Sequence, residues 1–118
     1  SMPAVIAQFA KQYPEIGVSL LDCSAENLLR HIQDIEVDLG VGTELGFMEA
    51  EDDINADLLY QLPFCVVMPD NHALAQPVKM RQFFIYQRSS RALSPATIAF
   101  KDFLQSYFSS HFNDLQHT

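Results

Sequence analysis

Two short polar segments, Ser24-Ala25 and Thr43-Glu44, hold the side chains best placed for binding chemistry in this sequence. Each follows an apolar stretch with strand character, and in open parallel α/β sheets ligands bind beyond the carboxyl ends of the strands. Ser24 offers a hydroxyl and the free amides of a helix start, which together favour anions, and Thr43 offers a second hydroxyl. We predict that Ser24, Ala25, Thr43 and Glu44 contact a small ligand. The alternative is that Ser24 only caps a helix.

The sequence lacks the motifs of common enzymes and of cofactor-binding proteins. It contains no GxGxxG, no phosphate loop, no GxSxG and no HExxH. No carboxylate lies beside an obvious nucleophile, and the four histidines are interpreted as surface residues, namely His31, His72, His111 and His117. We therefore predict no enzymatic activity, no catalytic residue and no cofactor.

Cysteines and acidic residues give little support to a metal site. Cys23 and Cys65 lie in apolar, strand-like runs without the spacing of metal ligands, so we expect reduced, buried thiols in a cytoplasmic protein. Acidic residues gather between Glu44 and Asp57. We interpret this cluster as a solvated loop; a metal site is the alternative, but the order of the carboxylates fits no calcium loop.

The first part of the chain has the pattern of a βαβ unit. Apolar spacing predicts a helix over residues 3–13 that Pro14 ends, then a strand over 16–22. A second helix is predicted over 25–33 and a second strand over 37–43. Short connections between strand, helix and strand favour a parallel strand pair.

The remainder of the chain predicts further strands and a closing helix. Ser94 is a good N-cap and Pro95 suits the first helical position. Helices interleave with strands, so we expect an α/β fold with a mostly parallel sheet flanked by helices. The predicted elements of this part are strands at 57–61, 64–69 and 83–88 and a short helical turn at 77–82.

Net charge separates this chain from nucleic-acid-binding proteins. Lys and Arg total 7 while Asp and Glu total 15, a formal charge of −8 among 118 residues. Such a chain repels phosphate backbones, so we expect no direct binding of nucleic acid. No apolar run is long enough to span a bilayer and no signal peptide is apparent, so we expect no membrane association and a cytoplasmic location.

Three segments, in this order, resemble the effector-binding domain of LysR-type transcriptional regulators. The first runs from PAVIAQFAKQYPEIGVSLLD to VDLGVGT, the second is LLYQLPFCVVMPDNHALA, and the third is RALSPATIAFKDFL. The resemblance implies the first subdomain of a type 2 periplasmic-binding-protein-like fold over residues 3–108. Residues 109–118 are predicted as a polar tail, with the alternative that Phe112 and Leu115 extend the closing helix. It also implies regulation by a small, anionic metabolite acting as effector in the intact protein.

The sequence departs from the family pattern in several places. The family's second subdomain has no counterpart between QFFIYQRSS and SPA, and we expect no DNA-binding domain in this chain. The strand that precedes the first helix in the family, and lies between the strands matching 16–22 and 37–41, is also missing. Ile35 occupies a turn position where the family usually has Gly.

These departures leave a second hypothesis open, namely that the chain is a protein-interaction or oligomerisation module without ligand binding of its own. An unfilled position between two apolar strands exposes backbone groups that another copy can satisfy. We expect a homo-oligomer, in the first instance a dimer, held by exchanged or edge-paired strands or by packing of helix 3–13.

Overall fold

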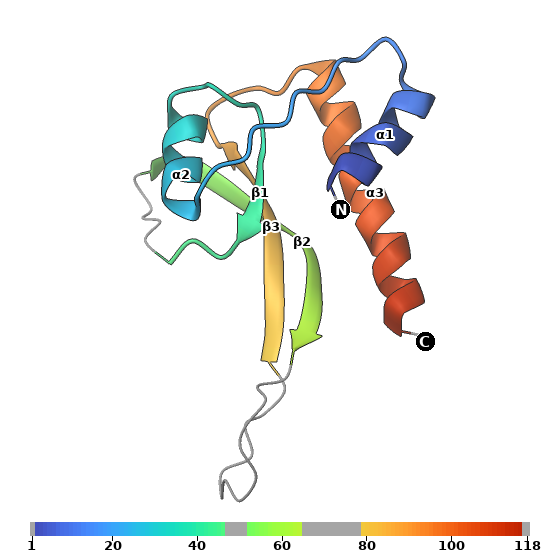
Figure 1. Ribbon diagram of the computed structural model, residues 1–118. Helices are drawn as coiled ribbons and strands as arrows, with labels where there is room; N and C mark the ends of the chain where they lie inside the picture. Colours follow the sequence, from blue (N-terminus) through green and yellow to red (C-terminus); the bar gives the residue numbers. More distant parts are fainter. Residues whose placement is uncertain (1, 47–51, 65–78, 117–118) are drawn as a thin grey trace, which may run out of the picture.

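The computed structural model describes residues 2–46, 52–64 and 79–116 of the chain. Within these residues, two helices, three strands and a closing helix follow one another along the chain and pack around one small sheet (Figure 1). The elements are α1 (Met2–Gln12), α2 (Ala25–Gln33), β1 (Gly40–Thr43), β2 (Ile54–Phe64), β3 (Lys79–Arg88) and α3 (Pro95–Gln116).

The sheet is antiparallel throughout, with the strand order β1-β3-β2. β3 pairs with β1 from Gly40 opposite Tyr86 to Thr43 opposite Phe83, and it pairs with β2 along nearly its whole length. The α/β class expected from the sequence is present, but the expected mostly parallel sheet is wrong for the described strands. The reason is that β1 has no parallel partner, because the predicted first strand does not form.

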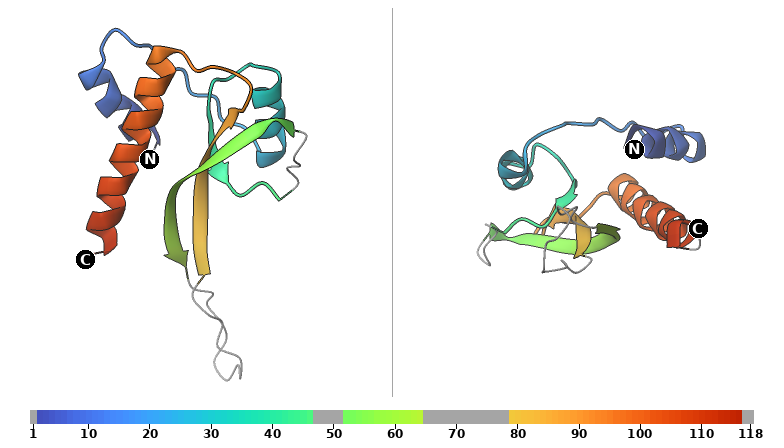
Figure 2. Two further views of the ribbon diagram at one scale, coloured as in Figure 1. Left: turned by 180° about the vertical axis from the view of Figure 1, so that it is seen from behind. Right: turned by 60° about the horizontal axis from the view of Figure 1, so that its bottom comes forward.

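Residues 16–22, here called the connecting segment, join α1 to α2 without entering the sheet (Figures 1 and 2). The prediction of a strand at 16–22, and with it the βαβ unit, is therefore wrong. The apolar run suits a strand, but a strand exists only when a neighbour accepts its backbone hydrogen bonds. Here β1 pairs with β3 alone, and Leu20 and Leu21 of the connecting segment remain 51% and 52% exposed.

The helices agree with the sequence prediction because their signals are local. Ser24 caps α2 by accepting a hydrogen bond from the Asn27 N–H at 3.3 Å, and Ser94 caps α3 by accepting one from the Thr97 N–H at 3.2 Å. Pro95 is the first residue of α3, as predicted. α3 continues to Gln116, so the segment predicted as a polar tail is largely helical.

β2 and β3 form one long ladder that differs in detail from the predicted strands. The predicted strand 57–61 lies inside β2, which continues through Pro63 instead of stopping there. An edge strand tolerates proline, and β2 is an edge of this sheet. Residues 79–82, predicted as part of a helical turn, begin β3, and the predicted strand 83–88 completes it. The predicted strand over 64–69 lies outside the described residues after Phe64.

Two clusters of buried side chains hold the helices on opposite faces of the sheet. Adjacent residues of a strand point to opposite faces, so β3 gives Ile85 to one cluster and Tyr86 to the other. Figure 2 shows α2 on one side of the molecule and the α1–α3 pair on the other. The first cluster contains Val5, Leu59, Ile85 and Leu104, and the second contains Leu28, Ile32, Leu45 and Tyr86.

Candidate functional site

The start of α2 presents two of the predicted site residues, Ser24 and Ala25, at the surface. The Ser24 hydroxyl is engaged as the helix cap, and the Ser24 carbonyl accepts from the N–H groups of Asn27 and Leu28 at 3.1 and 3.0 Å. The amides of Ala25 and Glu26 have no backbone partner among the described residues. They are the donors that the helix start offers to a ligand.

The end of β1 presents the other two, Thr43 and Glu44. Thr43 is the last residue of the strand, and its carbonyl oxygen accepts a hydrogen bond of 2.7 Å from the hydroxyl of Tyr86. Glu44 follows as an exposed residue. Burial raises the pKa of Tyr86, a backbone hydrogen bond from Leu45 opposes this, and the negative charge of Glu44 raises it further. Glu44 is therefore close enough to act electrostatically on a buried hydroxyl.

Two glycines of β1 let α2 approach the strand backbone. A β-carbon at Gly40 would lie 2.6 Å from Leu28 Cδ1 and 2.8 Å from Ile32 Cδ1, and one at Gly42 would lie 3.3 Å from Leu28 Cδ2. α2 and β1 run in opposite directions, so the start of α2 and the end of β1 lie at the same end of this pair (Figure 1). Among the described residues, no hydrogen bond joins Ser24 to Thr43, and their joint contact with a ligand stays a prediction.

The charges near these two ends are negative. Asp22 and Glu26 flank Ser24 and Ala25, and Glu44 follows β1. The amides of the helix start favour an anionic group, whereas the carboxylates favour a cation or a hydrogen-bond donor. The arrangement suits a molecule that carries both kinds of group better than it suits a polyanion.

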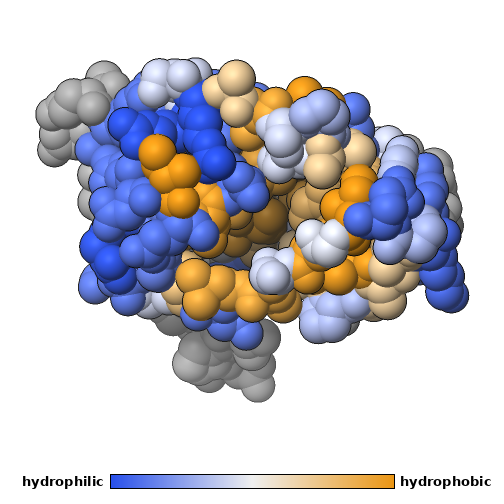
Figure 3. All heavy atoms as spheres, turned by 90° about the horizontal axis from the view of Figure 1, so that it is seen from above, coloured by the Kyte–Doolittle hydropathy of each residue, from blue (hydrophilic) through white to orange (hydrophobic). Residues whose placement is uncertain are grey.

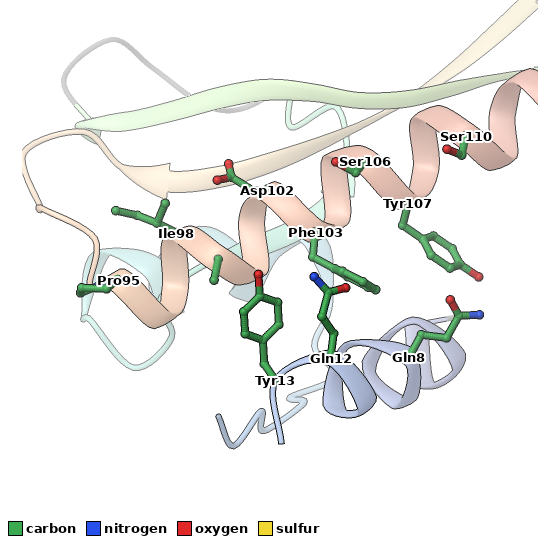
Figure 4. A pocket seen from close by; sticks show the side chains of 11 residues that line it. Gln8, Gln12, Tyr13, Pro95, Ile98, Asp102, Phe103, Ser106, Tyr107 and Ser110 are labelled. Carbon is green, nitrogen blue, oxygen red and sulfur yellow. The ribbon is translucent and has the colours of Figure 1, made fainter. Parts of the chain in front are cut away.

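A separate groove of about 680 Å³ lies between α1 and α3 (Figure 4). In Figure 4, Gln8 and Gln12 point from α1 toward Tyr107 and Phe103 of α3. The sequence contains a signal for this groove, since Gln8 and Gln12, like Ser106 and Ser110, are four residues apart and share a helix face. That signal is interpretable only once α1 is known to pack on α3. Its lining residues are Gln8, Gln12, Tyr13, Pro95, Ile98, Ala99, Asp102, Phe103, Ser106, Tyr107 and Ser110.

A polar network around Asp53 ties the end of α2 to the sheet. The Asp53 carboxylate accepts hydrogen bonds from Ser90 and, at 3.5 Å, from Arg88 Nε. Arg88 also donates to the carbonyl of Gln33 at 2.7 Å, at the last residue of α2. The network lies at the opposite end of α2 from Ser24, so we assign it a structural role and not a role in the candidate site. Within the described ranges, no group of three or more potential ligands could hold a metal ion.

Comparison with known protein families identifies the family of this chain. The family described as LysR substrate binding domain matches residues 1–81, about two thirds of the chain. The chain belongs to the LysR substrate-binding domain family. No curated protein and no solved structure matches it.

The family match covers α1, α2, β1, β2 and the first residues of β3. Ser24, Ala25, Thr43 and Glu44 all lie inside it, whereas α3, with most of the lining of the groove, lies outside. The resemblance of the segment around Ser94 to the C-terminal element of LysR-type domains therefore stays a prediction. Among the described helices, none combines the length and apolar character of a membrane span.

The structure corrects the prediction of buried cysteines. Cys23 is a free thiol, as expected, but it is exposed, because the connecting segment before it does not enter the sheet. Cys65 lies outside the described residues.

Proposed function

We propose that this chain senses a small metabolite for a LysR-type transcriptional regulator, through the start of α2 and the end of β1. The family match supports a sensing rather than an enzymatic role. The observation that carries the site is that α2, packed on Gly40 and Gly42, brings Ser24 to the same end as Thr43. A cytoplasmic regulator would meet such metabolites directly.

The preferred ligand is a small organic acid that also carries a hydrogen-bond donor or an amino group. Its carboxylate would lie against the amides of Ala25 and Glu26, where the helix dipole favours negative charge. Its donor group would face the Thr43 hydroxyl and the Glu44 carboxylate. A hydroxy acid or an amino acid satisfies both ends, while a dicarboxylate meets repulsion from Glu44.

Isothermal titration calorimetry of the full chain tests this proposal. The panel compares hydroxy acids and amino acids with dicarboxylates of matched size. Glu44→Gln should strengthen the binding of dicarboxylates relative to amino acids, because it removes one negative charge. Equal binding of all acids by the wild type and by Glu44→Gln would refute the proposed contact.

A matched pair of cap variants separates binding from helix stability. Ser24→Ala and Ser94→Ala each remove a hydroxyl that caps a helix through the third residue of the helix. Both should destabilise the protein similarly, but only Ser24→Ala should change the affinity for the acid. If both variants bind the acid as the wild type does, Ser24 is a cap alone.

The second candidate function is self-association, favoured by the exposed connecting segment. Leu20 and Leu21 are about half exposed, and the surface seen from above has a hollow bordered by hydrophobic residues (Figure 3). Large apolar side chains gathered on a short extended segment are typical of an interaction surface. Sedimentation at tens of micromolar protein distinguishes a dimer from a monomer, with circular dichroism as the control for folding.

A further inference from the structure

The connecting segment, residues 16–22, has the backbone of a strand without a neighbour. Its only backbone–backbone hydrogen bond to another described residue joins the Ile16 N–H to the Tyr13 carbonyl. The views in Figures 1 and 2 show it extended between α1 and α2, in front of the sheet. Such a segment presents a row of donors and acceptors that another extended chain can pair with.

The first four side chains of the segment alternate as in a strand, whereas residues 20–22 are all exposed. Ile16 and Val18 are partly buried, while Gly17 and Ser19 between them are exposed. Period-two burial is the pattern of a strand with one face on the protein. The local chain therefore needs little rearrangement to become a strand once a partner supplies hydrogen bonds.

The sequence of this segment is complementary to itself in the antiparallel sense. Pairing centred on Ser19 places Val18 opposite Leu20 and Gly17 opposite Leu21 of a second copy. Residues 16–21 carry no charged side chain, and Asp22 faces Ile16. The two Asp22 side chains lie at opposite ends, about 20 Å apart along the strands, and at this distance physiological salt screens their repulsion.

Other registers are less favourable. Centring the pair on Leu20 places Asp22 opposite Val18 and brings the two Asp22 residues to about 14 Å. It also shortens the paired length, because Ile16 then lacks a partner within the segment. The Ser19 register pairs all seven residues and keeps the two Asp22 side chains farther apart than the Leu20-centred register does.

We propose that two copies of this chain associate through antiparallel pairing of residues 16–22, with Ser19 on the two-fold axis. The interface is isologous, since each copy offers the same strand to the other. It buries Leu20 of both copies and satisfies backbone groups that the fold leaves unpaired. This inference deepens the second candidate function and is independent of metabolite binding.

Cysteine cross-linking tests the register. In a background with Cys23→Ser and Cys65→Ser, Ser19→Cys places two thiols on opposite residues, whose Cα atoms lie about 4.5–5.5 Å apart in an antiparallel pair. That spacing is within the range of a disulfide. Gly17→Cys is the matched control, because open space surrounds a side chain at Gly17 and its two copies would lie about 14 Å apart.

Under mild oxidation we expect a covalent dimer from Ser19→Cys and none from Gly17→Cys. In sedimentation, Leu20→Asp should weaken the dimer on the order of tenfold or more, because two apolar contacts are lost. Leu58→Asp is the control, since Leu58 is equally exposed but lies on β2. A dimer that neither cross-links at Ser19 nor responds to Leu20→Asp would overturn this interface alone. A folded monomer would overturn self-association as well.

Discussion

The hydroxyl of Tyr86, in the middle of the sheet, donates a hydrogen bond of 2.7 Å to the carbonyl oxygen of Thr43 at the end of β1. Tyr86 is 1% exposed, and its ring packs in the cluster under α2. The bond therefore connects the candidate site to the core. Any shift of the β1 end must either break this bond or move a buried ring.

Tyr86→Phe tests this connection. The ring is retained, so the expected loss of unfolding free energy is that of one hydrogen bond, about 1 kcal/mol. The proposed ligand affinity should fall as well, because the end of β1 is less well held. Urea denaturation followed by circular dichroism gives the first quantity and calorimetry the second. Unchanged stability would show that the Thr43 carbonyl finds an equivalent partner.

Ser94→Ala and Leu104→Ala compare a helix cap with a core residue of α3. The first removes the acceptor for the Thr97 N–H and should cost about 1 kcal/mol. The second empties a site that is 0% exposed and should cost about 2–5 kcal/mol. Phe103 of the same helix is only partly buried, so Phe103→Ala should cost less than the removal of a fully buried ring. If Ser94→Ala is the most damaging of the three, the packing of α3 is misassigned.

Ile35→Gly should stabilise the protein. Ile35 follows the C-cap of α2 and has a φ of 58°, in the left-handed region that a β-branched residue rarely adopts. Its side chain is half exposed, so little apolar contact is lost. Relief of the backbone strain should raise the unfolding free energy by about 1 kcal/mol. Thermal denaturation checks this, and a lower melting temperature for the glycine variant would contradict it.

Protonation of Asp53 in acid should lower the unfolding free energy of the protein. The hydroxyl of Ser90 lowers the pKa of this carboxyl below its ordinary value of 3.8; burial opposes the shift and Arg88 supports it. A lowered pKa in the folded state means that the contribution is present above pH 3.8 and is lost as the pH falls through the folded value. Asp53→Asn should therefore be less stable than the wild type at neutral pH. Below the folded-state pKa of Asp53 the wild type and the variant should have similar unfolding free energies, as urea denaturation at several pH values would show.

The helices could be predicted from the sequence and the sheet could not, for a physical reason. Ser24, Ser94 and Pro95 act on backbone groups within one helical turn, so their effect is visible in a short window. Residues 16–22 have an equally clear strand pattern, but pairing depends on a neighbour elsewhere in the chain. The same limit applies to β2, where Pro63 is tolerated only because the strand is an edge.

For the candidate site, the helix start at Ser24 and the strand end at Thr43 were predicted, but the strand expected before Ser24 does not form, and the surroundings of these residues depended on the fold. The cap by Ser24 is local and is confirmed. The role of Thr43 as an acceptor for Tyr86, which is 43 positions away, has no signal in the sequence. The groove between α1 and α3 joins the two ends of the described chain, and so it also required the structure.

Gly40→Ala probes how closely α2 must pack on β1. An added β-carbon would meet Leu28 Cδ1 at 2.6 Å and Ile32 Cδ1 at 2.8 Å, and both side chains are buried. Overpacking of this kind should cost about 1–3 kcal/mol, whereas Gly42→Ala meets one carbon at 3.3 Å and should cost less. Gly17→Ala, with open space around it, is the control and should be neutral or slightly stabilising.

Because Gly40→Ala pushes α2 away from β1, it should also weaken the proposed binding of the acid between their ends. Stability measured by urea denaturation and affinity measured by calorimetry should fall together; a loss of stability with unchanged affinity would separate the site from the α2–β1 contact.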